Sequence, residues 1–325
     1  MKKLMVIPLV AAGMAAMVGC SKTPVKEAAK NDAINLANLD TAVAPGTDFY
    51  QYACGGWMKN NPLKPEYARF GTFDQLRDNN QEQIRTLIEG LSETPGQEGS
   101  VGQKIGMLFA MGMDSVKLNE DGYAPIKDQL AEINKLGTKD ELTKMVATLH
   151  KEGMAPFFAL YVGADEKNSS MNIVQLYQAG LGMGDRDYYL LEDESSQKMR
   201  EAYKNYITRL FTLIGSSPEQ ADAAVNAIMK IERGIAEVSF SREDLRDSQK
   251  NYNKMSIEDF KAKNDLLNWD VYFESMGMMD IKYLDAKQLS FYEGLSALMK
   301  NTTLDEQKYY LTFNLLSSAA PYLSC

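Results

Sequence analysis

Residues Asp48 to Arg77 read DFYQYACGGWMKNNPLKPEYARFGTFDQLR and contain the start signals of two helices. The first signal predicts a short helix that Thr47 or Asp48 caps at its N-terminus. Glycine pairs and proline both interrupt helices, so this helix is expected to end at Gly55-Gly56 or near Asn60-Asn61-Pro62.

A second, longer helix is predicted to begin at Thr72. Thr72 and Gln75 have the spacing of a capping box, in which each side chain bonds the backbone amide of the other residue. Apolar residues then recur mostly at helical spacing, at Phe73, Leu76, Ile84, Leu87, Ile88 and Leu91.

Three side chains near the start of this helix form a candidate binding site. Phe73 and Arg77 are four residues apart and therefore share one helix face, and Arg69 lies just upstream in the preceding loop. Two guanidinium groups near a helix N-terminus suit a carboxylate, which arginine binds with two parallel hydrogen bonds. The alternative is structural, because Asp74 and Asp78 are close enough to pair with these arginines.

The composition predicts a folded, acidic chain. With 325 residues, of which 45% are hydrophobic, the chain can bury a substantial core in one large domain or two. Its formal net charge is −9 and no basic stripe stands out, so nucleic acid is not an expected partner.

The first residues predict export and lipidation. Lys2 and Lys3 precede an apolar stretch, Leu4 to Val18, that is too short for a convincing membrane span. Residues 17–20 resemble a bacterial lipobox, so we expect residues 1–19 to be a signal peptide and Cys20 to carry lipid. Residues 20–44 are expected to form a flexible tether between a bacterial membrane, on its periplasmic or cell-surface face, and a domain over residues 45–325. The alternative is an ordinary signal peptide with a coincidental cysteine.

The rest of the chain predicts a mainly α fold, a multi-helix lobe with a small β-hairpin. The hairpin comprises strand-like runs at Phe157 to Val162 and Met171 to Gln178, and Tyr283 to Ala286 is also expected to be extended. The Met111 and Met113 cluster is interpreted as core filling. Helices are expected at about residues 72–91, 104–119, 125–136, 139–151, 195–214, 218–240, 269–276, 291–299 and 304–316, and a further short helix is expected to begin at Ser256. Ser217 and Pro218 start the helix at 218–240, and a Thr303/Glu306 capping box starts the last one.

Three glycines at positions 180, 182 and 184 follow a predicted strand but do not match a nucleotide-binding loop. Their spacing is G-x-G-x-G, and the polar segment Asp185 to Asp187 follows where a helix should begin with apolar residues. We expect a structural turn instead, buttressed by Arg186 among carboxylates.

The sequence lacks the residues of a hydrolytic zinc site. Such a site needs two histidines four residues apart, a glutamate between them and a third ligand. His150 is the only histidine, and it lies in the last turn of a predicted helix, where an imidazole can bond free carbonyl groups. No G-x-S-x-G nucleophile motif is present, and runs such as Glu192-Asp193-Glu194 are typical of solvated surfaces. We therefore predict no catalytic and no metal-binding residue in this chain.

The opening stretch resembles the N-terminal signature of the neprilysin family of zinc metallopeptidases, peptidase family M13. Its DFYxYAxGGW run is followed by R-[FYW]-G-x-F-D-x-L-R. Further matches follow in the order of the family at Gly180 to Leu190, Tyr252 to Met255 and Ala319 to Ser324. The resemblance covers nearly the whole chain after the signal peptide, but only the N-terminal portion of the family, whose catalytic zinc motif lies in the C-terminal half.

This resemblance implies two mostly helical lobes around a cavity, and cleavage of small peptides by zinc-activated water. The N-terminal half would form most of the lobe that restricts access and would contribute to the substrate pocket. Residues that match Arg69 and Arg77 bind the C-terminal side of the substrate, including a free carboxylate. The residue that matches Phe73 lines the pocket for the side chain after the scissile bond. The family motifs N-A-x-[YF], H-E-x-x-H and E-x-x-x-D are absent here, although zinc is expected for a full-length member.

Two cysteines remain if Cys20 carries lipid, and their pairing stays open. A disulfide between Cys54 and Cys325 is possible because their number is even, but the sequence does not show that they are close. In animal members of the family the cysteine that matches Cys54 bonds to a cysteine in the catalytic half. The resemblance therefore implies a free, buried thiol at Cys54.

These observations together predict the N-terminal, substrate-enclosing part of an exported zinc endopeptidase that is inactive alone. Its expected partners are peptide substrates, a C-terminal catalytic half and a membrane, reached through the lipid anchor. The chain stops at Cys325 beside an apolar segment, which we interpret as a truncation. The alternative is a non-catalytic surface lipoprotein that binds peptides or other anions through Arg69, Phe73 and Arg77.

Overall fold

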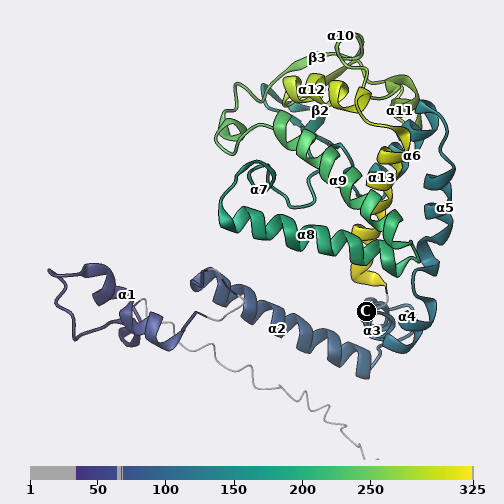
Figure 1. Ribbon diagram of the computed structural model, residues 1–325. Coiled ribbons are helices and arrows are strands. Elements are labelled where there is room, and N and C mark those ends of the chain that lie inside the picture. Colours follow the sequence, from purple (N-terminus) through teal and green to yellow (C-terminus); the bar gives the residue numbers. More distant parts are fainter. Residues whose placement is uncertain (1–33, 64–66, 68, 324–325) are drawn as a thin grey trace, which may run out of the picture. The chain divides into compact units, whose positions relative to one another are not determined.

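The computed structural model describes residues 34–63, 67 and 69–323, which form mostly helices and one small sheet (Figure 1). The chain divides into two compact units, and the boundary lies after Gly106, inside helix α3 (Val101–Gly112). None of the described helices is both long enough and apolar enough to cross a membrane.

The first unit contains a short 3₁₀ turn, η1 (Leu36–Asn38), followed by α1 (Phe49–Asn60) and α2 (Thr72–Glu93). Asp48, one of the two residues predicted as the cap, caps α1 by accepting a hydrogen bond from the Gln51 amide at 2.9 Å. The helix runs past both glycines to the later of its two predicted ends. A Cβ at Gly56 would lie 2.4 Å from the Ala37 carbonyl oxygen, so Gly56 allows η1 to approach α1 closely.

Helix α2 begins at the predicted residue, but the predicted capping box is wrong. Thr72 is already the first helical residue, and the Asp74 carboxylate accepts the hydrogen bond of the Gly71 amide at 2.9 Å. The side chain of Gln75 donates instead to Asn61 Oδ1 at 3.2 Å. The helix begins one residue too early for the Thr72 hydroxyl to cap it, and Asp74 provides the acceptor.

The second unit is a helical lobe built around a four-stranded sheet with the order β1-β2-β4-β3. Strands β1 (Phe158–Asp165) and β2 (Asn168–Gln178) form the predicted antiparallel hairpin, with Phe158 opposite Gln178. Strand β4 (Tyr283–Ala286), expected to be extended, pairs parallel with β2, and β3 (Lys254–Ser256) completes the sheet.

The remaining elements of this unit are helices. They are α4 (Ser115–Asp121), η2 (Ala124–Ile126), α5 (Lys127–Lys135), α6 (Lys139–Lys151), α7 (Asp187–Leu190), α8 (Glu194–Leu213), α9 (Pro218–Val238), η3 (Asp244–Arg246), α10 (Ile257–Lys263), α11 (Trp269–Met276), α12 (Leu289–Lys300), α13 (Leu304–Ala319) and η4 (Ala320–Tyr322).

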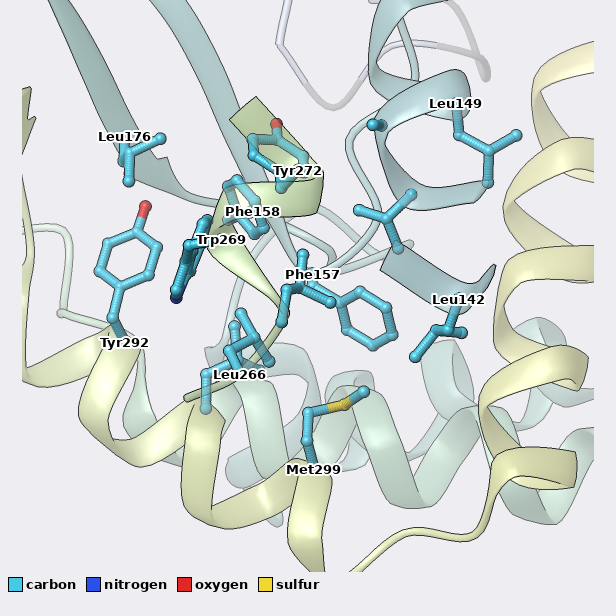
Figure 2. Close-up of a cluster of buried hydrophobic side chains, with 14 of the residues drawn as sticks. Leu142, Leu149, Phe157, Phe158, Leu176, Leu266, Trp269, Tyr272, Tyr292 and Met299 are labelled. Atoms are coloured by element: carbon cyan, nitrogen blue, oxygen red, sulfur yellow. The ribbon is translucent and has the colours of Figure 1, made fainter. Parts of the chain in front are cut away.

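The main core of this unit lies between the sheet and the surrounding helices. Figure 2 shows Phe158 of β1 among Trp269, Tyr272 and Tyr292 from α11 and α12, and its ring centroid lies 5.5, 5.5 and 5.9 Å from theirs. A second apolar cluster lies among α8, α9 and α13, which Figure 1 shows together. Burial of these large aromatic and aliphatic side chains is the main stabilising contribution to the unit.

Two interpretations of buried side chains are wrong. Met111 and Met113 are 67% and 65% exposed, so within the described residues they do not fill a core. Cys54 has no disulfide partner within the described residues, and it is half-buried, whereas the family resemblance implies a buried thiol. Helical spacing shows that one face is apolar, but it does not show which segment covers that face.

Candidate functional site

The segment before α2 is held to α1 by an aromatic cluster. The rings of Trp57 and Phe70 stack with centroids 6.0 Å apart, and Tyr67 meets Phe70 edge-on at 5.2 Å. Such contacts contribute about 0.5–1.5 kcal/mol each beyond the buried area. Tyr67 and Phe70 of this cluster are close in sequence to Arg69, immediately before the helix.

Arg77 lies one turn into α2 and pairs with the nearby acids, as the structural alternative predicts. Its Nη2 is 3.2 Å from Asp74 Oδ1, its Nε is 3.9 Å from Asp78 Oδ1, and its guanidinium carbon is 5.6 Å from the centre of the Tyr67 ring. The Tyr67 hydroxyl donates to Asp78 Oδ1 at 2.7 Å. The hydrogen bond with Tyr67, and then the neighbouring carboxylates, raise the pKa of Arg77.

These ion pairs leave the site able to accept an anion. The Arg77 side chain is 51% exposed, and water screens exposed ion pairs so that they contribute little to stability; an incoming carboxylate can therefore compete with Asp74. Phe73 is 88% exposed, and Arg69 is also exposed. Phe73 and Arg77 lie one turn apart in α2, as their spacing predicts. The arrangement suits a carboxylate beside an apolar group.

A second candidate is a cavity of about 610 Å³ in the other unit, which the sequence analysis missed. The glycine-rich loop between β2 and α7 lines it, together with residues of α9 and α13. Glu232 also lines this cavity and is 1% exposed; burial raises its pKa to about 7. The sequence does contain a signal for the burial of Glu232. Ile228, Ile231 and Ile235 give α9 an apolar face, and the helical spacing places Glu232 on that face.

The glycine-rich segment is a structural turn, as expected. Gly180 and Gly184 have φ values of 95° and 77°, which favour glycine, and a Cβ at Gly182 would lie 1.8 Å from the Tyr203 hydroxyl oxygen. Arg186 buttresses the turn, as predicted: its guanidinium donates to the backbone carbonyl of Ser239, and its charge acts on the neighbouring Asp185 carboxylate.

His150 has a structural role, although its partners lie outside its own helix. Its Nε2 is 3.1 Å from the Pro156 carbonyl oxygen and its Nδ1 is 2.6 Å from the Tyr272 hydroxyl. Burial lowers its pKa to about 4, so the imidazole is neutral near pH 7. Among the residues that the structure describes, no three His, Cys, Asp or Glu side chains come together to hold a metal ion.

A family model described as peptidase family M13 matches residues 45–325. The chain belongs to peptidase family M13. This M13 chain is 29% identical to mouse endothelin-converting enzyme 1 over 348 aligned positions, which cover 99% of the chain and 44% of the relative. It is also 29% identical to the human enzyme over 300 positions, which cover 89% and 38%. The M13 chain thus spans less than half the length of these relatives.

Solved structures with the same fold include two from bacteria. Zinc metalloprotease Zmp1 of Mycobacterium tuberculosis, solved with an inhibitor, matches with a TM-score of 0.79 and 24% identity, over 90% of the M13 chain and 44% of its own. PepO from Lactobacillus rhamnosis matches with a TM-score of 0.69 and 21% identity, over 87% and 44%. The predicted mainly α lobe with a small hairpin is therefore confirmed as a fold.

Proposed function

We propose that this M13 chain is the N-terminal, substrate-enclosing part of an exported zinc endopeptidase that cleaves small peptides. The observation that carries the proposal is that Arg69, Phe73 and Arg77 are all exposed, in the first turns of α2 or in the loop before it, in a member of this family. Arg69 and Arg77 would bind a free C-terminal carboxylate, and the Phe73 ring would contact an apolar substrate side chain.

The residues of this chain do not fit a catalytic zinc ion. A hydrolytic zinc site takes three protein ligands, and His150 is the only histidine of the chain. Both of its ring nitrogens already have partners, Tyr272 and Pro156. In this proposal zinc and the catalytic water belong to polypeptide outside this sequence.

Two experiments test the catalytic part of the proposal. Translation of the gene beyond codon 325 in all three frames should reveal H-E-x-x-H followed by E-x-x-x-D; a stop with neither motif would contradict a longer enzyme. The purified chain, incubated with zinc and short peptides, should not hydrolyse them. Substantial zinc-dependent hydrolysis would show that we have misassigned the catalytic residues.

Binding to the site is tested with one peptide in two forms. A short apolar peptide with a free C-terminal carboxylate should bind more tightly than its C-terminal amide in calorimetry. Arg77→Ala should weaken binding of the free acid about tenfold, which corresponds to about 1.4 kcal/mol, and should remove the preference for the acid. Arg85→Ala is the matched control, because Arg85 lies on the same helix and pairs with nearby Glu89 at 2.8 Å.

The same binding experiment separates the two functions that the sequence left open. Tight peptide binding by the chain as it stands, combined with a gene that lacks the downstream motifs, would favour the non-catalytic lipoprotein. Equal loss of binding in Arg77→Ala and Arg85→Ala would argue against this group as the binding site in either case.

A further inference from the structure

One buried carboxylate joins four parts of the helical lobe. Glu232 of α9 accepts a hydrogen bond from the Tyr189 hydroxyl of α7 at 2.7 Å and from the Tyr203 hydroxyl of α8 at 2.9 Å. The backbone amide of Gly182, in the loop between β2 and α7, approaches the same carboxylate at 3.4 Å. The loop amide of Met183 also donates to the Tyr189 hydroxyl, at 2.9 Å. Glu232, directly and through Tyr189, therefore gives the loop one of its several attachments to the lobe, beside those made by Arg186, Arg242 and Tyr310.

No cation of the described residues balances this carboxylate. The nearby guanidinium groups are used elsewhere: Arg186 donates to the Ser239 carbonyl, and Arg242 pairs with Asp185. The groups that face Glu232 are the hydroxyls of Tyr189 and Tyr203 and, farther away, the hydroxyl of Tyr310 on α13, which donates to the Gly180 carbonyl at 2.8 Å. A buried carboxylate without a cation costs free energy when it is ionised, even when hydrogen bonds compensate part of the cost.

Because ionisation of buried Glu232 costs free energy, the position of the loop depends on whether Glu232 carries a proton. When the carboxyl group is protonated, it is neutral and tolerates burial. When it is ionised, movement of the loop lets water reach the carboxylate and relieves the cost. The loop and Glu232 also line the cavity of about 610 Å³, so loosening of the loop changes access to that cavity.

We propose that Glu232 is a proton-controlled latch, which keeps the loop of residues 179–186 closed when it is protonated and releases it when it ionises. The latch is a property of the helical lobe and does not depend on the peptidase function. It would make the cavity more accessible in mildly alkaline than in mildly acidic surroundings.

Hydrogen–deuterium exchange of the loop amides tests the proposal on the whole chain. The pKa is about 7 in the closed state and is taken as the ordinary value of 4.5 in an open, solvated state. Linkage then makes opening about 30-fold more favourable at pH 8.5 than at pH 5.5, after correction for the intrinsic exchange rate. Glu232→Gln, which cannot ionise, should remove this dependence. Glu237→Gln is the matched control, since Glu237 lies on the same helix but is exposed and pairs with Arg233.

A second variant keeps the test decisive if Glu232→Gln does not fold. Tyr203→Phe removes one donor that favours the ionised carboxylate, so the pH midpoint of loop opening should move upward. The proposal is overturned if loop exchange in the wild-type chain shows no pH dependence beyond the intrinsic rate. It is equally overturned if Glu232→Gln keeps the full dependence, or if Tyr203→Phe leaves the midpoint unchanged.

Discussion

At the scale of single residues, Glu232 and His150 respond to pH in opposite directions. Because Nε2 of His150 faces a carbonyl oxygen, it must carry the proton, and Nδ1 then accepts from the Tyr272 hydroxyl. Burial favours the neutral form of both groups, so it raises the pKa of Glu232 to about 7 and lowers that of His150 to about 4.

These shifts give opposite contributions to stability between about pH 4.5 and 6.5. In this window the folded chain binds one more proton than the unfolded chain at Glu232, so this contribution falls as the pH rises. At His150 the folded chain binds one proton fewer, so the contribution rises with pH. The two contributions cancel in the wild-type chain.

Replacing either residue should therefore expose the contribution of the other. Relative to wild type, the free energy of unfolding of Glu232→Gln should rise by about 1.4 kcal/mol per pH unit between pH 4.5 and 6.5, and that of His150→Gln should fall at the same rate. Urea unfolding at several pH values measures both. If the free energy of unfolding of both variants changes with pH as it does in the wild-type chain, then these two groups do not titrate as their burial requires.

The site residues differ in how far the sequence could predict them. Spacing and resemblance singled out Arg69, Phe73 and Arg77, because the signal lies within nine consecutive residues. Whether Arg77 pairs with Asp74 could not be decided, since that depends on rotamers set by packing around Tyr67. Glu232 was missed because a charged residue within a helix is usually exposed.

At the scale of secondary-structure elements, two glycines bring α9 and α12 close together. A Cβ at Gly234 of α9 would lie 2.4 Å from Cδ1 of Leu298, and a Cβ at Gly294 of α12 would lie 2.5 Å from Cγ1 of Val238. Each glycine thus faces a branched side chain of the other helix. The absence of side chains at these positions permits the close helix contact.

Gly294→Ala should destabilise the lobe although alanine is the better helix former. The added methyl group meets Val238, whose β-branched side chain has little freedom to move. Overpacking costs about 1–3 kcal/mol, and the gain in helix propensity is about 1 kcal/mol, so we expect a net loss of up to about 2 kcal/mol. Thermal unfolding measures the difference. Asn226→Ala, at an exposed position of α9, should be neutral or slightly stabilising, and a Gly294→Ala chain as stable as this control would refute the packing argument.

Local signals predicted most elements of the lobe correctly. The Ser217 cap with Pro218 after it and the Thr303/Glu306 capping box are present as predicted. The hairpin was also found, because alternation and turn residues act over short distances. Strand β3 was missed since it has only three residues, and the parallel pairing of β2 with β4 joins segments that are far apart in sequence.

At the scale of the whole molecule, apolar side chains are exposed on helix α3. Leu108 and Met111 are 72% and 67% exposed. Large exposed apolar patches mark interaction sites or promote aggregation.

Leu108→Lys combined with Met111→Lys should reduce self-association of the purified chain, measured by sedimentation velocity. The melting temperature should stay unchanged, because neither side chain is buried in the described residues. Asn119→Lys combined with Asn205→Lys adds the same charge at exposed polar positions and is the matched control. An equal decrease of self-association in both double variants would show that added charge, and not the apolar patch, controls association.

The proposed lipid anchor at Cys20, which lies outside the described residues, is a further property of the whole molecule. Expressed in a bacterial host, the wild-type chain should be found in the membrane fraction and incorporate labelled fatty acid. Cys20→Ser should abolish the label and release the chain, whereas Cys54→Ser should change neither. Membrane association of Cys20→Ser equal to that of wild type would contradict lipidation at this residue.

The sequence by itself determined the family, the mainly α class, the caps at Ser217 and Thr303, the hairpin and the positions of Arg69, Phe73 and Arg77. These features depend on residues near one another in the chain, where spacing fixes geometry. Only the tertiary structure decided the order of the sheet, the exposure of the methionine face and the burial of Glu232 beside a cavity. Those features depend on which distant segments meet, and a local pattern shows that a face is apolar without showing what covers it.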